Sequence, residues 1–531
     1  MAIRSVTSLD ISLRFVPSIS SRFASSFSAQ EHDTVSDSAD HEQLRIDLPT
    51  LQHSTDADTL AQILLLHHNP FHAMESSLQL QGIAFSSNLF QQTLLRLRHN
   101  SKIAVSFFHY SLSLPSDEPL HSSASYNLLI DILGKVRQFD LAWQLIILMD
   151  QRKIAPTSVT FAIMIRRLIA AGLTRQAIRA FDDMEIFVKE KVDVDAFCFL
   201  LDTLCKYGYP KVADEIFNQR KWTFSPNVRM YTILIYGWCK INRIDRAERF
   251  LREMIAKGIE PNVVTYNVIL NGVCRKSSLH PEWRFERTIW EAEKVFDEMR
   301  KRGIEPDVMS FNILLHVYSR AHKPQLTLDK LNLMKQMGIS PTVATYTSVI
   351  KCLCSCGRLE DAEALLEEMT RNGVSPSAAT YNSFFKEYRG RNYSENALKL
   401  YRRMKEEGLC SPSLNSYNIL LSMFMKLNQM EVVKEIWDEM KVSDTGPDLD
   451  SYTLLIHGLC EKKKWKEACQ FFVEMIEKGL LPQKVTFETL YRGLIQSDKL
   501  RTWRRLQKRL DEESITFRSE FQNYHLKPYR R

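Results

Sequence analysis

The sequence has little of several features that mark well-known protein classes. Its 531 residues include only 17 Gly and 18 Pro, which excludes collagen-like and low-complexity architectures and favours helices. No apolar run reaches the roughly 18 residues that a membrane-spanning helix requires. The formal net charge is +7, but two of these charges lie in the first 30 residues and five in the last 31, so the middle is neutral. A nucleic-acid surface in the middle would therefore need charge sorted onto one face.

Catalytic and metal-binding signatures are lacking as well. The zinc-deaminase signature, H-x-E followed by P-C-x-x-C, is incomplete, because the H-x-E at residues 280–282 is followed by no P-C-x-x-C. No Gly-rich phosphate loop is present either. Cys352, Cys354 and Cys356 form a C-x-C-x-C run, but only the outer two share a helix face and no His lies near, so we do not expect a metal site. Five cysteines, Cys354 among them, recur at one place of a helical pattern and are interpreted as small packing residues: Cys205, Cys239, Cys274, Cys354 and Cys460. We therefore expect no enzymatic activity and no cofactor.

The first 30 residues have the composition of an organelle-targeting segment. They contain nine Ser, three Arg and a single acid, without the continuous apolar stretch of a secretory signal. Residues 22–25 resemble a mitochondrial processing site. The segment predicts import into the mitochondrion, with the chloroplast as the alternative, and residues 31–53 are interpreted as a disordered linker.

Two series of residues recur along the chain with a common period of about 35. Aromatic residues stand at Tyr126, Phe161, Phe197, Tyr231, Tyr266, Phe311, Tyr346, Tyr381, Tyr417, Tyr452 and Phe487. Prolines follow in register at Pro156, Pro226, Pro261, Pro306, Pro341, Pro376, Pro412, Pro447 and Pro482. Most periods also have a small residue, then a Met, at helical spacing, and a Gly often follows where a left-handed helix cap is needed. Each unit is therefore predicted to be a hairpin of two helices that must stack on its neighbours, and the fold to be an all-α superhelical solenoid.

We divide residues 123–483 into ten units, referred to below as units one to ten. Their predicted ranges are 123–157, 158–193, 194–227, 228–262, 263–307, 308–342, 343–377, 378–413, 414–448 and 449–483. Residues 54–122 are expected to form degenerate helical hairpins, and residues 484–531 an atypical capping unit with a basic tail. An insertion of about ten residues, within Lys276 to Trp290 of unit five, could contact RNA or a partner, or form an idle loop.

These residues resemble a known family. The runs V-V-T-Y-N at 263–267 and G-I-E-P-D at 303–307, repeated through the ten units, are similar to the pentatricopeptide repeats of plant organelle proteins, in their plain type. The resemblance implies sequence-selective binding of single-stranded RNA, with one nucleotide for each repeat. The expected partner is single-stranded organellar RNA, bound by a monomer.

The residue that follows the aromatic in each unit is predicted to point toward the RNA groove, because the aromatic and its apolar neighbours must face the core. These residues are Asn127, Ala162, Cys198, Thr232, Asn267, Asn312, Thr347, Asn382, Asn418 and Thr453. The resemblance implies that each selects a base jointly with the residue after the proline. The second members are Thr157, Asp193, Asn227, Asn262, Asp307, Thr342, Ser377, Ser413, Asp448 and Gln483. Such residues are also ordinary helix N-caps, although their recurrence at two places of each unit favours base selection.

For units four to nine, the resemblance implies the base order A, U, pyrimidine, purine, C, U from the 5′ end. Three apolar residues beside the base-selecting ones, Val159, Val264 and Met309, are expected to sandwich a base. Eight residues beyond the first set, cations are expected to meet backbone phosphates: Lys135, Lys206, Lys240, Arg275, Arg320 and Lys426.

The sequence therefore predicts a noncatalytic RNA-binding protein of the mitochondrion, which would act in transcript processing, stabilisation, splicing or translation. A protein-binding adaptor of the related 34-residue tetratricopeptide type is the alternative. Against the adaptor stand the 35-residue period, the polar residue after the proline and the lack of a W-x-x-L-G-x-x-Y pattern.

Overall fold

The computed structural model describes residues 49–52, 54–66, 86–113, 121–189, 192–276, 285–406, 408, 410–443, 446–497, 499, 501, 502 and 504. The predicted targeting segment, nearly all of the linker, residues 277–284 of the insertion and most of the basic tail lie outside these residues. The described part is built from helices without a β-strand. The predicted all-α solenoid is confirmed.

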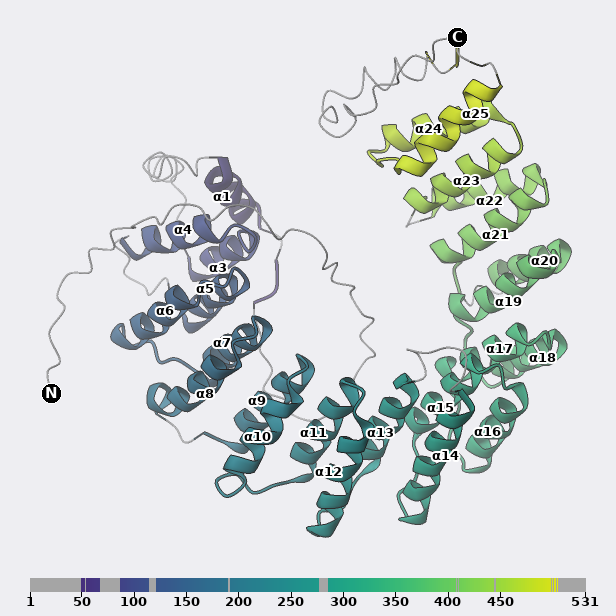
Figure 1. Ribbon diagram of the computed structural model, residues 1–531. Helices are drawn as coiled ribbons and strands as arrows, with labels where there is room; N and C mark the ends of the chain where they lie inside the picture. The colour runs from purple at the N-terminus through teal and green to yellow at the C-terminus, as the bar shows by residue number, and fades with distance from the viewer. Residues whose placement is uncertain are drawn as a thin grey trace, which may run out of the picture.

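Ten helix pairs follow one another along the chain (Figure 1). The first helices of the pairs are α5 (Ser123–Lys135), α7 (Ser158–Ala170), α9 (Val194–Lys206), α11 (Val228–Lys240), α13 (Val263–Lys276), α15 (Val308–Arg320), α17 (Val343–Ser355), α19 (Ala378–Arg391), α21 (Leu414–Lys426) and α23 (Leu449–Glu461). The second helices are α6 (Phe139–Gln151), α8 (Thr174–Val188), α10 (Pro210–Arg220), α12 (Ile244–Ala256), α14 (Phe285–Lys301), α16 (Pro324–Gln336), α18 (Leu359–Arg371), α20 (Ser394–Glu406), α22 (Met430–Val442) and α24 (Trp465–Glu477). The helices α1 (Thr55–Leu66), α3 (Ser87–Arg96) and α4 (Ser101–Ser113) precede these pairs, and α25 (Lys484–Gln496) follows them.

The pairs are arranged in two layers along a curved array. Each first helix packs against the first helices of the neighbouring pairs and against its own second helix. In Figure 1 the first helices form the inner layer of an open arc and the second helices form the outer layer. We call the two kinds inner and outer helices. Because neighbours and an outer helix cover the other sides of an inner helix, its remaining side faces the concave surface.

The recurrent apolar residues form the core between the layers. The aromatic of unit four, Tyr231, is fully buried, as are Ala247 and Met254 of the outer helix α12. The Tyr231 hydroxyl reaches the edge of the core and donates to Glu253 Oε1 at 3.1 Å. The same link joins Tyr346 to Glu368 and Tyr452 to Glu474, both at 2.9 Å. Each of these tyrosines thus places its ring among apolar residues and its hydroxyl against a carboxylate, which ties the two helices of its unit together.

Helix ends follow the local chemistry of the sequence. In most units the inner helix starts at a Ser, Thr, Asp or Asn whose side chain accepts a hydrogen bond from the third residue of the helix, as Asp307 does from the Ser310 N–H at 2.8 Å. After the outer helix α12, Gly258 has φ +73°, a left-handed conformation that glycine adopts without strain. The buried Pro261 then prevents the helix from continuing.

Close approach between inner helices depends on glycine at two places. A Cβ added to Gly237 would overlap the Cys205 thiol, and one added to Gly272 would overlap the Cys239 thiol. Both cysteines are buried and belong to the preceding inner helix. Cys205 and Cys239 are therefore packing residues, and each contacts a glycine of the next unit.

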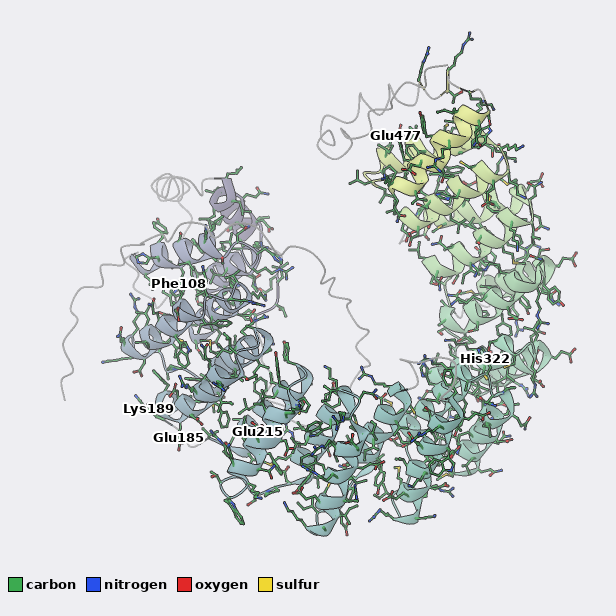
Figure 2. All side chains as sticks on the ribbon, viewed as in Figure 1. Phe108, Glu185, Lys189, Glu215, His322 and Glu477 are labelled. Atoms are coloured by element: carbon green, nitrogen blue, oxygen red, sulfur yellow. The ribbon has the colours of Figure 1, made fainter. Side chains whose placement is uncertain are left out.

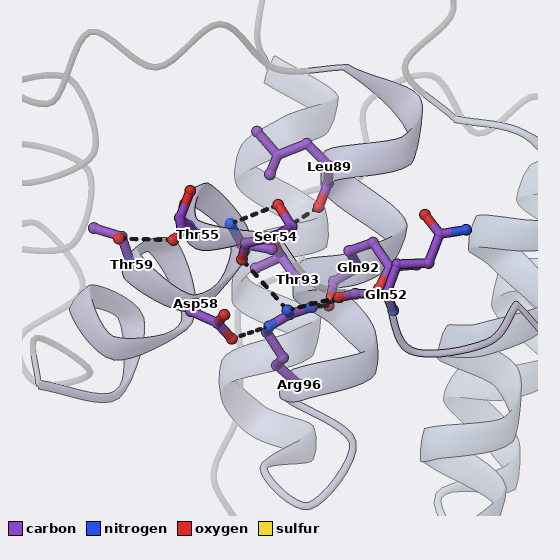
Figure 3. Close-up of polar contacts among 10 residues, drawn as sticks. Gln52, Ser54, Thr55, Asp58, Thr59, Leu89, Gln92, Thr93 and Arg96 are labelled. Carbon is purple, nitrogen blue, oxygen red and sulfur yellow. Dashed lines mark hydrogen bonds and ion pairs between the residues drawn. The ribbon is translucent and has the colours of Figure 1, made fainter.

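A polar cluster joins α1 to α3 at the N-terminal end of the array (Figure 3). The Arg96 guanidinium pairs with Asp58 and donates to the backbone carbonyl oxygens of Gln52, at 3.0 Å, and Ser54, at 3.4 Å. The nearly buried Gln92 accepts from the Gln52 N–H at 2.8 Å. Through these contacts α3 fastens the segment that leads into α1. None of the helices that the structure describes combines the length and apolarity needed to span a bilayer.

Candidate nucleic-acid interface

Each inner helix leaves one narrow stripe of side chains uncovered. In α15, Phe311, Leu314 and Leu315 are buried, whereas Met309 and His316 are exposed. Exposed and half-buried residues recur at the second, fifth, ninth and thirteenth positions of the units, a spacing that places them on one side of a helix. We call these four positions the inner stripe. Side chains of the inner helices extend toward the concave side of the arc (Figure 2), so the inner stripes of successive units line that surface.

The first set of base-selecting residues occupies the fifth position of the stripe. In units four to seven, nine and ten these residues are half-buried between successive inner helices. Asn127 and Asn382 are nearly buried, with 7% and 5% of their surface exposed, and Ala162 and Cys198 are buried. The sequence predicts that this place points toward the groove, but in these four units the residue is buried or nearly buried.

The second set lies at the starts of the inner helices. Nine of its members cap the helix that follows, by accepting a hydrogen bond from a backbone N–H at its third residue, and only Gln483 makes no such bond. The capping interpretation of the sequence is therefore true of this set. Capping places each of these side chains beside the end of the preceding unit's stripe.

The two members of a pair meet across the boundary between units. In unit five, Asn267 Nδ2 donates to Asp307 Oδ1 at 3.0 Å, and Ser310 Oγ donates to Asn267 Oδ1 at 2.6 Å and to Asp307 Oδ1 at 2.9 Å. In unit eight, Asn382 Nδ2 donates to Ser413 Oγ at 3.4 Å. Pairs that are distant in sequence are thus brought into direct contact.

In four more units a single hydroxyl joins the pair, and it belongs to the third residue of the next inner helix. Thr265 joins Thr232 to Asn262 through contacts of 2.8 and 3.0 Å. The other bridges are Thr345 between Asn312 and Thr342, Thr380 between Thr347 and Ser377, and Ser451 between Asn418 and Asp448. Every pair from unit four to unit nine is therefore joined directly or through one side chain.

The residues expected to sandwich bases lie at the second position. Met309 exposes 39% of its surface, and Val159 and Val264 are half-buried. All three belong to the inner stripe, one turn before the fifth position.

The six predicted phosphate-contacting cations occupy the thirteenth position, and their surroundings differ. Lys135 pairs with Asp131 at 3.1 Å and Lys206 with Asp202 at 2.9 Å. Lys240 Nζ donates to the backbone carbonyl of Lys206. The Arg320 guanidinium lies over the Phe285 ring, 6.0 Å from its centroid, while Arg275 and Lys426 are exposed.

The ninth position of the stripe belongs to none of the residue sets that the sequence predicts to bind RNA. It holds Asp131, Arg166, Asp202, Tyr236, Asn271, His316, Lys351, Lys386, Ser422 and His457 in units one to ten. Lys351 and Lys386 are exposed. The signal for this row is its spacing, because each residue stands four places after a fifth-position residue and so shares its helix face.

The C-x-C-x-C run has the properties of packed thiols. Cys352 and Cys354 are buried at the end of α17, and Thr327 Oγ1 donates to Cys352 Sγ at 3.5 Å. Burial raises the pKa of the Cys352 thiol to about 11 and also raises that of Cys354. A thiolate, the form that binds metal, is therefore disfavoured at both.

Comparison with known proteins agrees with this repeat architecture. A profile of the PPR repeat family matches residues 121–170, 226–275, 341–390, 412–461 and 447–496, one of the pentatricopeptide repeat domain matches 294–355, and one of the PPR repeat matches 379–409. A mitochondrial pentatricopeptide repeat-containing protein of Arabidopsis thaliana is 65% identical over 487 residues, which cover 92% of this chain and 94% of the relative.

A second mitochondrial pentatricopeptide repeat-containing protein of Arabidopsis thaliana is 40% identical, and the match covers 77% of this chain and 71% of that protein. Among solved structures, the pentatricopeptide repeat protein PPR10 in complex with an 18-nucleotide psaJ RNA element matches 84% of this chain and 72% of its own, with 23% identity and a TM-score of 0.38.

Proposed function

The chain belongs to the pentatricopeptide repeat family, and from this premise we propose that it is a plain-type member that binds single-stranded RNA in a sequence-selective manner along its concave surface. Each unit would meet one nucleotide. The fifth-position residue and the capping residue of the next unit would contact the base edge. The apolar second-position residues would contact the base faces.

The observation that carries this proposal is the joined pairs of units four to nine. Asn267 and Asp307 present an amide and a carboxylate at one point of the concave surface, held by Ser310. Polar side chains fixed in this way can discriminate between bases, because a mismatched base leaves one of their donors or acceptors unpaired. A unit without such a pair, such as unit two with Ala162, would tolerate any base.

The protein acts in the mitochondrion, in agreement with the targeting composition of its first 30 residues and with the relative of 65% identity, which is named as a mitochondrial protein. We propose that it acts there as a monomer and by occupancy rather than by catalysis. A bound transcript segment would be shielded from exonucleases, kept open for splicing, or kept accessible to a ribosome.

Immunoprecipitation of the mature protein from mitochondria, followed by sequencing of the bound RNA, tests this function. We expect enrichment of a short transcript segment that contains the order A, U, pyrimidine, purine, C, U. Recovery of a defined set of proteins with no enriched RNA, before and after nuclease treatment, would instead support the adaptor function.

A further inference from the structure

The inner stripe changes its charge along the array. In units one to three its charged residues balance: Asp131, Lys135, Arg166, Asp195, Asp202 and Lys206. In units four to nine the stripe holds cations and no acid: Arg229, Lys240, Arg275, Arg320, Lys351, Lys386 and Lys426. In unit ten its charged residues, Asp450 and Glu461, are acidic. The net charge of the chain does not reveal this change along the stripe, because residues 31–500 carry no net charge.

The cations of the first three units are already neutralised by contacts within the protein. The carboxylate of Asp131, only 5% exposed, contacts Lys135 at 3.1 Å, Arg166 at 3.1 Å and Arg167 at 2.6 Å. Asp202 pairs with Lys206 at 2.9 Å, and Asp195 pairs with Arg229. A phosphate could bind here only by competing with a carboxylate for the same cation, and an additional phosphate would be repelled by these acids.

Four of the seven cations of the central units have no such partner, whereas Arg229 pairs with Asp195 and Lys240 donates to the carbonyl of Lys206. Arg275, Lys351, Lys386 and Lys426 are all exposed and form no ion pair within the described part of the chain. Desolvation is the main cause of the lowered pKa of His316, and the positive charges of Arg320 and Lys351 lower it further. Such cations bind a phosphate without first losing a carboxylate partner.

The same six units, four to nine, are those in which the base-selecting pairs are joined by hydrogen bonds. The joined base-selecting pairs therefore span residues 228–448, and the exposed, unpaired cations lie within the same range, from Arg275 of unit five to Lys426 of unit nine. We propose that this protein binds the RNA backbone over units four to nine only, a footprint of six nucleotides. Units one to three, whose charges are neutralised by internal ion pairs, and the acidic unit ten would extend the solenoid without holding the RNA backbone. This inference rests on the proposed RNA-binding function and specifies which part of the surface performs it.

Affinity as a function of RNA length tests the footprint. The full chain would be titrated with the RNA A-U-C-G-C-U, with truncations of it, and with versions extended by three uridines at the 5′ end or by one at the 3′ end. We expect affinity to fall sharply with each nucleotide removed from the hexamer and to change less than about threefold on extension. If extension at the 5′ end raised the affinity tenfold or more, units one to three would also bind the RNA backbone, and the proposal would be overturned.

Two matched lysine variants test the charge division. Lys351→Ala removes an unpaired cation of α17, whereas Lys135→Ala removes a paired cation of α5 whose partner Asp131 keeps its two arginines. In a plot of log affinity against log salt, Lys351→Ala should make the slope shallower by about 0.7, the value for one phosphate contact with a single strand, and Lys135→Ala should leave it unchanged.

Equal effects of the two substitutions on the slope would contradict the proposed division between units four to nine, which hold the RNA backbone, and the flanking units, which do not. A chain that binds no RNA of any length or sequence, while its circular dichroism shows a folded helical protein, would refute the proposed function itself. The two failures are therefore distinguishable. Thermal melting of Lys351→Ala should match the parent, since Lys351 is exposed. Lys135→Ala should lower the melting temperature only slightly, since Asp131 keeps its contacts with Arg166 and Arg167.

Discussion

Asn267 and Asp307 lie 40 residues apart, and the amide of the first donates a 3.0 Å hydrogen bond to the carboxylate of the second across the boundary between units five and six. The carboxylate oxygen that accepts this bond also accepts the Ser310 N–H and so begins α15. One carboxylate oxygen of Asp307 therefore both caps α15 and belongs to a base-selecting pair. A substitution at either residue changes both the recognition surface and the packing of two units.

Replacing Asn267 with Thr beside an unchanged Asp307 should move the base preference of unit five from U toward G. The shorter hydroxyl lacks the amide that reaches a small pyrimidine and leaves room for a purine. Base contacts of about 1 to 3 kcal/mol make the change visible as roughly a tenfold switch in competition binding. Asn127→Thr in unit one is the matched control and should not alter the preferred sequence. A variant of Asn267 that keeps its U preference at lower affinity would show that this residue only packs.

Two helix glycines should respond in opposite directions to alanine. Gly272→Ala places a methyl group on the Cys239 thiol and should destabilise the boundary between units four and five by about 1 to 3 kcal/mol. Gly390→Ala meets no atom within 4 Å and should stabilise α19 by about 0.5 to 1 kcal/mol. Hydrogen exchange of Gly272→Ala should show loosening mainly of the units next to the substitution. Uniform loosening of all ten units would argue against a quasi-one-dimensional array.

The buried Asp131 cluster should make the N-terminal units sensitive to acid. Burial alone would raise the pKa of Asp131, but Arg167 and Lys135 outweigh it and hold this pKa below its ordinary value. Its stabilising contribution is therefore complete above the unfolded pKa of about 3.9 and is lost as the pH falls through the lower native value. Asp131→Asn should lower stability at pH 7 and flatten its dependence on pH below 5, as measured by urea unfolding. Asp150→Asn, which removes an exposed carboxylate near Lys189, should retain the acid dependence of the parent.

The cysteines should differ in their reactivity toward alkylating agents. Burial raises the pKa of the thiols of Cys239 and Cys274 to about 12, so thiolate is scarce at both at pH 8. Cys356 and Cys410 are only half-buried. Mass spectrometry after iodoacetamide treatment of the folded protein should find these two modified first, with all ten cysteines modified after unfolding. Rapid alkylation of Cys239 in the folded chain would show that the inner helices separate easily.

The repeat architecture was predictable because it depends on local chemistry. The spacing of Tyr231, Ala247 and Met254 within one unit identifies two amphipathic helices, and Gly258 with Pro261 identifies the end of the second. These relationships span at most about 35 residues. A repeated hairpin can bury its apolar faces only by stacking on its neighbours. The sequence by itself therefore determined the helical pairs and their order, whereas the fifth position, which it places in the groove, is buried or nearly buried in four units.

Only the tertiary structure decided which polar side chains meet across the boundaries between units. The pairing of Arg167 with Asp131, the donation from Lys240 to the carbonyl of Lys206, and the covering of Asn382 all involve neighbouring inner helices. Such contacts depend on the angle and offset with which successive helices pack, which shift from unit to unit and leave no trace in the period of the sequence. The sequence places the cations on the concave surface, but it does not show whether a carboxylate of a neighbouring helix neutralises a given lysine. The packing of successive inner helices determines this, and so it decides which cations remain available to bind a phosphate.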